Sequence, residues 1–200
     1  MVGDNRAMLE NEFPFDPAAT APPPLPGPVR PTFRFMMAHP AHVMALGFGS
    51  GLSPVAPGTA GTLWAWLAFV VLQPSMTDTR WALLIAAAIP LGWWACTITA
   101  RNMRVLDPGS IVWDEIAAFW LVLWLVTPTG WVGQLLAFGL FRYFDAAKPG
   151  PVGWADRLFH NVNPATDPGA WRKAGFGIMF DDFVAAGCAL LVMAGWRFYQ

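Results

Sequence analysis

The chain has 200 residues, of which 56% are hydrophobic and 12% are charged; that charged share is about half that of an ordinary soluble domain. A mean hydropathy of +0.43, together with 12 tryptophans, excludes a water-soluble globular protein and predicts an all-α, polytopic membrane bundle. The net charge of −1 excludes a nucleic-acid reader, which needs a strongly basic surface.

The N-terminal region is rich in proline and poor in large apolar side chains, with eight prolines within residues 1–31. Such a composition cannot bury a core, so we expect a disordered Pro-rich tail over residues 1–32. Residues 33–200 then form a single membrane-embedded domain. Its first stretch, Phe33 to Val43, mixes Met and Phe with Arg and His, and we expect it to lie at the membrane interface.

A glycine- and proline-rich stretch follows at residues 47–62, with five glycines, two prolines and four hydroxyl side chains. This composition predicts a loop. Its amides and hydroxyls could cradle a phosphate, which makes Ser50, Ser53 and Thr59 candidate substrate contacts; a plain turn between helices has the same composition. The apolar run from Gly61 to Gln73 covers only about 20 Å of the ~30 Å hydrocarbon core. We therefore expect the loop before it to be re-entrant.

The apolar runs predict about five membrane spans, of which the run from Gly61 to Gln73 is the first. The other four are Arg80 to Ala100, Ile111 to Thr127, a run that begins at Trp131, and Ala174 through Ala194. Basic residues gather on the cytoplasmic side of membrane proteins. A cytoplasmic N-terminus places all but two of the 12 basic residues on that side, the exceptions being Arg80 and Arg197.

Carboxylates recur at the cytoplasmic ends of these spans. Asp114 and Glu115 open the third span, Asp145 lies in the last turn of the fourth, and Asp181 and Asp182 open the fifth. An ionisable group at the edge of the hydrocarbon is costly and indicates function. The alternative is a simple acidic first turn, which complements the helix dipole. Because the predicted topology brings all five to one face and one depth, we expect a single site.

Five neighbouring carboxylates repel one another unless a cation neutralises them. They are hard oxygen ligands without Cys or a well-placed His, which favours Mg²⁺ or Mn²⁺ over Zn²⁺. All five are candidate metal ligands and catalytic residues. We favour Asp114, Asp145 and Asp181 as direct ligands, with Glu115 or Asp182 behind them or acting as the base.

Two basic side chains near the fourth span, Arg142 and Lys148, cannot bind a metal but can hold an anion. They are therefore candidate substrate-binding residues. A metal, two cations and a glycine-rich loop at a lipid surface together predict phosphoryl chemistry on a lipid.

The sequence resembles the bacterial phosphatidylglycerophosphatase A enzymes over roughly His39 to Ala194. Four blocks carry the resemblance: F-G-S-G-L-S-P-x-x-P-G-T, G-S-I-V-W-D-E, F-R-x-x-D-x-x-K-P and G-I-M-x-D-D. It implies Mg²⁺-dependent hydrolysis of phosphatidylglycerol phosphate to phosphatidylglycerol and phosphate, among the lipids of the bacterial inner membrane and on its cytoplasmic side. The chain departs from the family pattern at residues 148–151 and 161–173, which leaves the shape of the substrate access open.

The sequence lacks the signature motifs of two rival classes of enzyme. The D-x-x-D-G-x-x-A-R motif of CDP-alcohol phosphatidyltransferases and the P-S-G-H motif of histidine-nucleophile phosphatases are absent from the sequence. The alternative from another class is an ion-coupled membrane transporter with a carboxylate-lined cation site. A transporter would hold its carboxylates near the membrane midplane, whereas these lie at one end of the spans.

Overall fold

The computed structural model describes residues 27–159 and 162–198, and every regular element in this part of the chain is helical. The predicted all-α class is therefore confirmed for these residues. Most of the predicted Pro-rich tail, residues 1–26, lies outside them. The last part of that tail contacts the end of a long helix, where the amide of Val29 donates to the carbonyl oxygen of Met103 at 2.9 Å.

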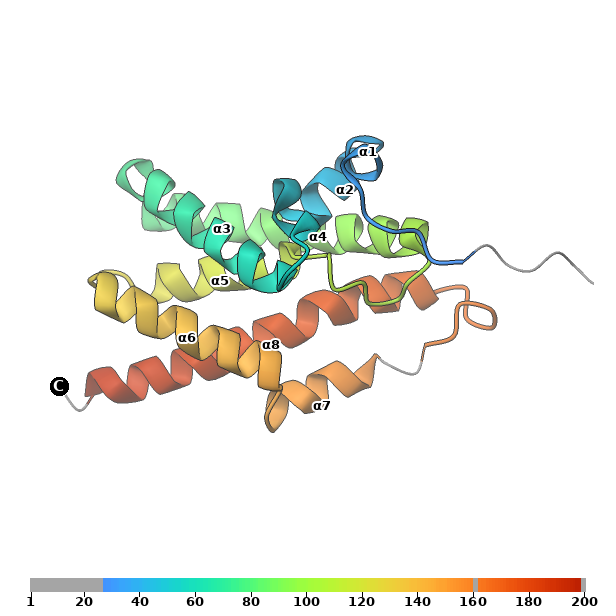
Figure 1. The fold of residues 1–200 in the computed structure, drawn as a ribbon. Coiled ribbons are helices and arrows are strands. Elements are labelled where there is room, and N and C mark those ends of the chain that lie inside the picture. Colours follow the sequence, from blue (N-terminus) through green and yellow to red (C-terminus); the bar gives the residue numbers. More distant parts are fainter. Residues whose placement is uncertain (1–26, 160–161, 199–200) are drawn as a thin grey trace, which may run out of the picture.

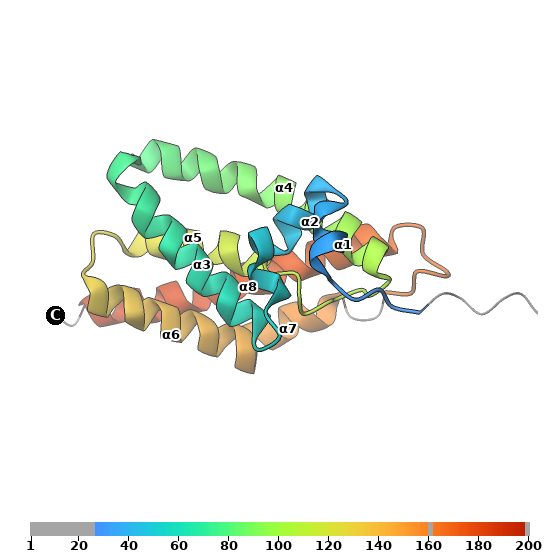
Figure 2. The ribbon, with the colours of Figure 1, turned by 45° about the horizontal axis from the view of Figure 1, so that its top comes forward.

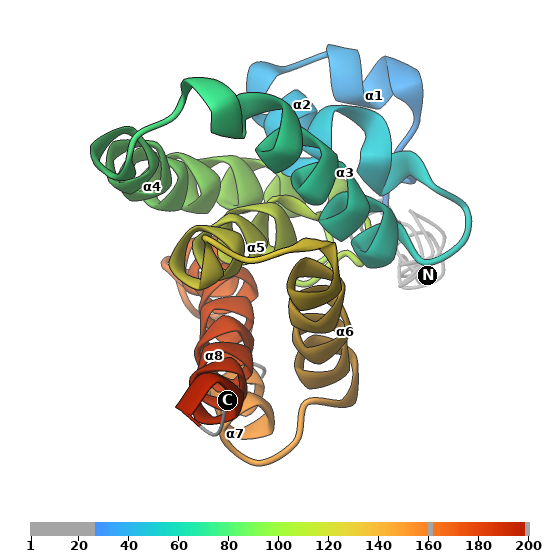
Figure 3. The same cartoon turned by 90° about the vertical axis from the view of Figure 1, so that its left-hand side faces the viewer.

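The elements follow in chain order as α1 (Phe33–Met37), α2 (Pro40–Ala45), the 3-10 helix η2 (Gly47–Leu52), α3 (Pro57–Leu72), the 3-10 helix η3 (Gln73–Ser75), α4 (Asp78–Met103), α5 (Trp113–Val126), α6 (Trp131–Ala147), α7 (Pro151–Leu158) and α8 (Ala170–Phe198). Helices α4, α5, α6 and α8 run along one long axis, and α3 is inclined to it (Figure 1 and Figure 2). Viewed down that axis, α5 lies in the middle of the bundle (Figure 3).

Helix α5 forms the core, with eleven of its fourteen residues buried. A helix that is apolar all round is stable only where other helices cover it, as α3, α4, α6 and α8 do here. Two of its tryptophans tie it to its neighbours: the indole N–H of Trp113 donates to Ala88 O of α4, and that of Trp120 to Ala65 O of α3, each at 3.0 Å. These bonds fix the rotation of α5 and so the direction of its first-turn carboxylates.

The predicted interfacial segment, Phe33 to Val43, forms the two short helices α1 and α2, which are held at the end of α4 by a buried histidine. His42 Nδ1 donates to the carbonyl oxygen of Phe35, and its Nε2 accepts from the Asn102 amide, both at 2.9 Å. Burial lowers the pKa of His42 because the charged ring would lose its water. The imidazole is therefore neutral in this position.

One sequence-based boundary was wrong. The predicted loop through residue 62 ends earlier, because Pro57 starts α3 at its first helical position and Thr59 is already helical. The polar segment after α6 contains a further helix, α7, for which the sequence analysis made no prediction. Proline and glycine at helix starts gave both stretches the composition of a loop.

Close packing explains part of the glycine content of the loop. A Cβ on Gly61 would lie 2.7 Å from the Val112 Cβ, and one on Gly51 would lie 2.1 Å from the carbonyl oxygen of Ser110. Only glycine allows η2 and α3 to approach the segment that leads into α5 this closely. The loop thereby positions the start of α5.

Two described helices, α4 with 26 residues and α8 with 29, are long and apolar enough to cross a membrane. About five spans were predicted; α3, α5 and α6 have 16, 14 and 17 residues, fewer than the about 20 that a span usually needs. The outer faces of the short helices are nonetheless apolar, since Leu67 of α3 is 64% exposed and Leu135 of α6 is 60% exposed. Such surfaces are typical of contact with lipid or protein.

Candidate active site

Three carboxylates converge where α5 begins, on the side that faces α8. Asp114, Glu115 and Asp182 each offer an oxygen, and these oxygens lie within 4.8 Å of one another. We call these three residues the carboxylate cluster. Their side chains are nearly or fully buried, with residue exposures of 9%, 8% and 3%.

The carboxylate cluster is electrostatically unsatisfied. Asp114 Oδ1, Glu115 Oε2 and Asp182 Oδ2 are buried and have no hydrogen-bond partner among the described residues. A buried, charged oxygen without a hydrogen-bond donor costs roughly several kcal/mol. Buried carboxylates therefore normally have a counter-ion or carry a proton. One oxygen from each of the three residues could bind the same cation, and hard oxygen donors at this spacing fit a divalent cation such as Mg²⁺.

Helix packing brings α8 close enough to complete the cluster. A Cβ on Gly175 would lie 2.8 Å from the backbone nitrogen of Thr97, so α8 packs almost backbone to backbone on α4. Two turns further along α8, Asp182 reaches the first turn of α5. Of the two glycines before Asp181 and Asp182, Gly175 serves this contact with α4, whereas Gly177 makes room for Phe159, which follows α7.

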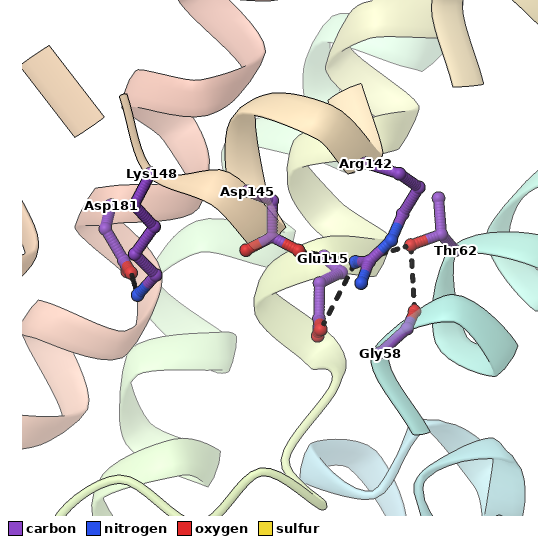
Figure 4. A network of polar contacts seen from close by, with 7 residues as sticks. All are labelled: Gly58, Thr62, Glu115, Arg142, Asp145, Lys148 and Asp181. Carbon is purple, nitrogen blue, oxygen red and sulfur yellow. Dashed lines mark hydrogen bonds and ion pairs between the residues drawn. The ribbon is translucent and has the colours of Figure 1, made fainter. Parts of the chain in front are cut away.

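Arg142 forms one edge of the site and joins three helices (Figure 4). Its Nη1 lies 2.5 Å from Asp145 Oδ2 on the same helix, 3.7 Å from Glu115 Oε1 on α5 and 3.4 Å from Thr62 Oγ1 on α3. All three contacts use one terminal nitrogen of the guanidinium. The side chain is thus held beside the carboxylate cluster rather than within it.

Lys148 forms the opposite edge and caps the end of α6 in a left-handed conformation. Its Nζ pairs with Asp156 of α7 and lies 2.6 Å from Asp181 Oδ2 of α8. Partial burial lowers the pKa of Lys148, but the hydrogen bonds to the two carboxylates outweigh that effect and raise its pKa above the usual value. The ammonium is therefore charged throughout the neutral range.

The start of α3 closes the site on a third side. A Cβ on Gly58 would lie 2.2 Å from Glu115 Oε1 and 3.3 Å from Arg142 Nη1, so a larger residue here would displace the Glu115 carboxylate or the start of α3. The residue before α3, Ala56, provides no side-chain cap. First-turn amides of α3 thus keep their capacity to bind an anion next to Arg142.

The structure brings all five predicted carboxylates into one region but groups them differently from our favoured assignment. Asp145 and Asp181 were expected as direct ligands, yet they pair with Arg142 and Lys148, while Glu115 and Asp182 join Asp114. Adjacent residues on a helix point about 100° apart, and packing decides which of the two faces inward. The sequence of an acidic pair does not reveal that choice.

The hydroxyls predicted to contact substrate bond largely within their own loop. Ser50 Oγ donates to Gly47 O and Ser53 Oγ to Val55 O, each at 2.8 Å, and Thr59 lies in the first turn of α3. Sequence analysis missed Gly58 and Thr62 as residues beside Arg142, and Asp156 as a partner of Lys148. Gly58 and Thr62 stand next to Thr59 and Gly61 in the same glycine-rich stretch, but Asp156 lies in a segment without a motif.

The fold and the site together define a class: a helical protein, in the part of the chain that the structure describes, with two helices long and apolar enough to cross a membrane and a buried acidic centre flanked by an arginine and a lysine. The sequence model of the family described as Phosphatidylglycerophosphatase A matches residues 43–197. The chain therefore belongs to the phosphatidylglycerophosphatase A family and is a phosphatase. The resemblance inferred from the four sequence blocks is confirmed.

Two curated relatives carry the same name. The Phosphatidylglycerophosphatase A of Escherichia coli is 39% identical over 152 residues, which cover 76% of this chain and 80% of the relative. That of Haemophilus influenzae is 36% identical over 170 residues, covering 85% of this chain and 96% of the relative. No solved structure matches the chain.

Proposed function

We propose that this protein hydrolyses phosphatidylglycerol phosphate to phosphatidylglycerol and inorganic phosphate, with Mg²⁺ held by Asp114, Glu115 and Asp182. One observation carries the proposal: three buried carboxylate oxygens without partners lie beside an arginine. The named activity of the Escherichia coli and Haemophilus influenzae relatives supports the choice of substrate.

The residues around the cluster have distinct roles in this reaction. When bound, Mg²⁺ supplies the positive charge that polarises the phosphoryl group and acidifies a water molecule. Arg142 holds the phosphomonoester, because a guanidinium binds phosphate oxygens in pairs. Asp145 positions Arg142 through their hydrogen bond. The first-turn amides of α3 at Gly58 add donors on the same side.

Lys148 fixes the position of the end of α6 relative to α7 and α8. Its bonds to Asp156 and Asp181 already engage the ammonium with two carboxylates. Lys148 therefore contributes a positive field at the opposite edge and keeps the three helices in register. Burial also keeps bulk water away from the cluster, which strengthens every charge interaction inside it.

We further propose that all five long helices cross the bacterial inner membrane, with the site on the cytoplasmic side. Helices α3, α5 and α6 cover about 21 to 26 Å, and the part of α8 from Asp181 to its end covers a similar length. The cluster would then lie at the headgroup boundary. Among the described basic residues, only Arg80 and Arg197 lie at the far end of the bundle, as the positive-inside rule requires.

The position of the acidic residues favours the phosphatase over an ion-coupled transporter. Asp114 and Glu115 stand in the first turn of α5, and Asp145 stands in the last turn of α6. A transporter binds its ions near the membrane midplane.

The direct test uses the purified full-length protein in lipid–detergent micelles that contain phosphatidylglycerol phosphate. We expect release of inorganic phosphate with Mg²⁺, and loss of that release with EDTA that excess Mg²⁺ restores. Asp167→Asn, which alters an exposed carboxylate paired with Lys173, is the matched control and should behave like the unmodified protein. Undiminished phosphate release in EDTA would contradict the metal assignment, and no release with Mg²⁺ would contradict the function.

A further inference from the structure

An apolar groove leads away from the site between α3 and α6. It has a volume of about 280 Å³ and is lined by Leu63, Trp66, Leu67, Val70 and Trp131. We call these five residues the α3–α6 groove. None of them carries a charge, and Leu63, Leu67 and Trp131 are 49%, 64% and 67% exposed, so the groove opens onto the outer surface of the bundle.

One end of the groove adjoins the polar site along α3. Leu63 directly follows Thr62, whose hydroxyl lies 3.4 Å from Arg142 Nη1. From Leu63 to Val70 the groove follows α3 away from the site for about 10 Å. A cationic end joined to an apolar channel of this kind complements an amphiphile with an anionic head and a hydrocarbon chain.

A fixed aromatic ring forms the floor of the groove. The indole N–H of Trp66 donates to Gln134 Oε1 on α6 at 2.7 Å. Its ring stacks on Phe138 with the centroids 5.6 Å apart and an interplanar angle of 26°. Because its one polar atom is satisfied by Gln134, Trp66 presents only apolar surface, and it holds α3 and α6 at a constant separation.

We propose that the α3–α6 groove binds one acyl chain of the lipid substrate while its phosphomonoester lies at Arg142. This inference rests on the proposed function and adds the path by which the lipid reaches the site, from the bilayer and between two helices. The acyl chain contributes binding energy in proportion to the apolar area that it buries in the groove. The acyl chain also orients the head group of the lipid, because an acyl chain that lies along α3 points the phosphate toward Arg142.

The larger apolar groove of the molecule provides a matched control. It lies between α3 and α4, has a volume of about 610 Å³ and includes Leu91, which is 51% exposed. Trp113 and Trp120 of α5 form part of its wall, and it does not include Leu63, the residue that adjoins Thr62 in the α3–α6 groove. A substitution there alters a second apolar groove on the surface of the bundle that does not adjoin Thr62.

The first experiment compares Leu67→Trp with Leu91→Trp in the full-length protein. Each variant is assayed with long-chain and with six-carbon-chain phosphatidylglycerol phosphate. For Leu67→Trp we expect the ratio of long-chain to short-chain kcat/KM to fall about tenfold, mainly through KM. Leu91→Trp should keep the ratio of the unmodified protein. An unchanged ratio in Leu67→Trp, or an equal fall in both variants, would overturn the proposal.

The second experiment needs no substitution and decides the question alone if Leu67→Trp does not fold. A phosphatidylglycerol phosphate with a photoreactive group in one acyl chain is crosslinked to the unmodified protein, and the modified peptides are mapped. We expect labelling of residues 63–70 and of Trp131. Labelling confined to the α3–α4 groove, or residues 63–70 left unlabelled because a second copy of the chain covers them, would overturn the proposal. If the protein hydrolyses the lipid but gives this negative result, only the groove proposal is wrong. If the protein does not hydrolyse the lipid, the proposed function itself is wrong.

Discussion

Glu115 Oε1 lies 3.7 Å from Arg142 Nη1, so the carboxylate cluster of α5 and the basic side chain of α6 share one edge. The ion pair is partly buried, with side-chain exposures of 11% for Glu115 and 19% for Arg142. A phosphate at this edge can meet a cation held by the carboxylates on one side and the guanidinium on the other. The proposed phosphate site therefore depends on α5 and α6 together.

The carboxylate cluster should bind Mg²⁺ through Asp182. Asp182→Asn keeps the shape of the side chain and removes its charge, so we expect activity to fall at least about 100-fold. We also expect Mg²⁺ to raise the Tm of the unmodified protein but not that of the variant, because a ligand stabilises only a fold that binds it. Phosphate release and thermal unfolding with and without Mg²⁺ test this. A Mg²⁺-dependent Tm shift that persists in the variant would refute the assignment of Asp182.

Arg142 should bind the substrate phosphate through its planar fork. Arg142→Lys keeps the charge but cannot hold two phosphate oxygens and Asp145 together, so we expect KM to rise about tenfold or more. Initial rates over a range of lipid concentrations measure this. A variant with unchanged KM and kcat would mean that Arg142 only anchors the end of α6 at the membrane surface.

Gly58 should be required for the geometry of Glu115. In Gly58→Ala the new Cβ would lie 2.2 Å from Glu115 Oε1, so the carboxylate or the start of α3 must move. We expect a higher Mg²⁺ concentration for half-maximal activity. Gly139→Ala on α6 is the matched control, since its Cβ meets no atom within 4 Å. The control should be as active as the unmodified protein; an equal loss in both variants would point to a general effect on the helices.

Acidification should loosen the attachment of α1 and α2. Burial lowers the pKa of His42, so between its folded pKa and the unfolded value of about 6.5 the unfolded chain binds more protons. The His42 contribution to stability is therefore fully present above about pH 6.5 and is lost as the pH falls below it. We expect Tm to drop from pH 7 to pH 5 in the unmodified protein, and to drop less in His42→Gln. Identical pH profiles would show that another group titrates.

Water should attack the phosphorus directly. Asp145 pairs with Arg142 and Asp181 pairs with Lys148, and in the proposed function the three carboxylates of the cluster hold Mg²⁺. With the carboxylates used in these ways, a water molecule is the expected nucleophile, rather than an Asp that would form an aspartyl-phosphate. A single turnover in ¹⁸O-labelled water should therefore place the label in the released phosphate. Label found on a protein carboxylate would establish the covalent route instead.

The sequence by itself determined the helical class, the family and the identity of the acidic and basic residues. Apolar runs of helical length predicted α4 and α8 to within about one turn at each end. Four motif blocks predicted the candidate site, because their residue types, in that order, suit phosphate chemistry. These features depend on local composition and spacing, which a sequence states directly.

Only the tertiary structure decided which carboxylates meet. Asp181 and Asp182 are neighbours in the sequence, but one pairs with Lys148 and the other joins Asp114 and Glu115. The rotation of each helix about its own axis makes that choice. This rotation is set by contacts between distant segments, such as Trp113 with Ala88. The α3–α6 groove has the same origin, since its walls come from helices about 70 residues apart, and the pattern along either helix alone does not reveal it.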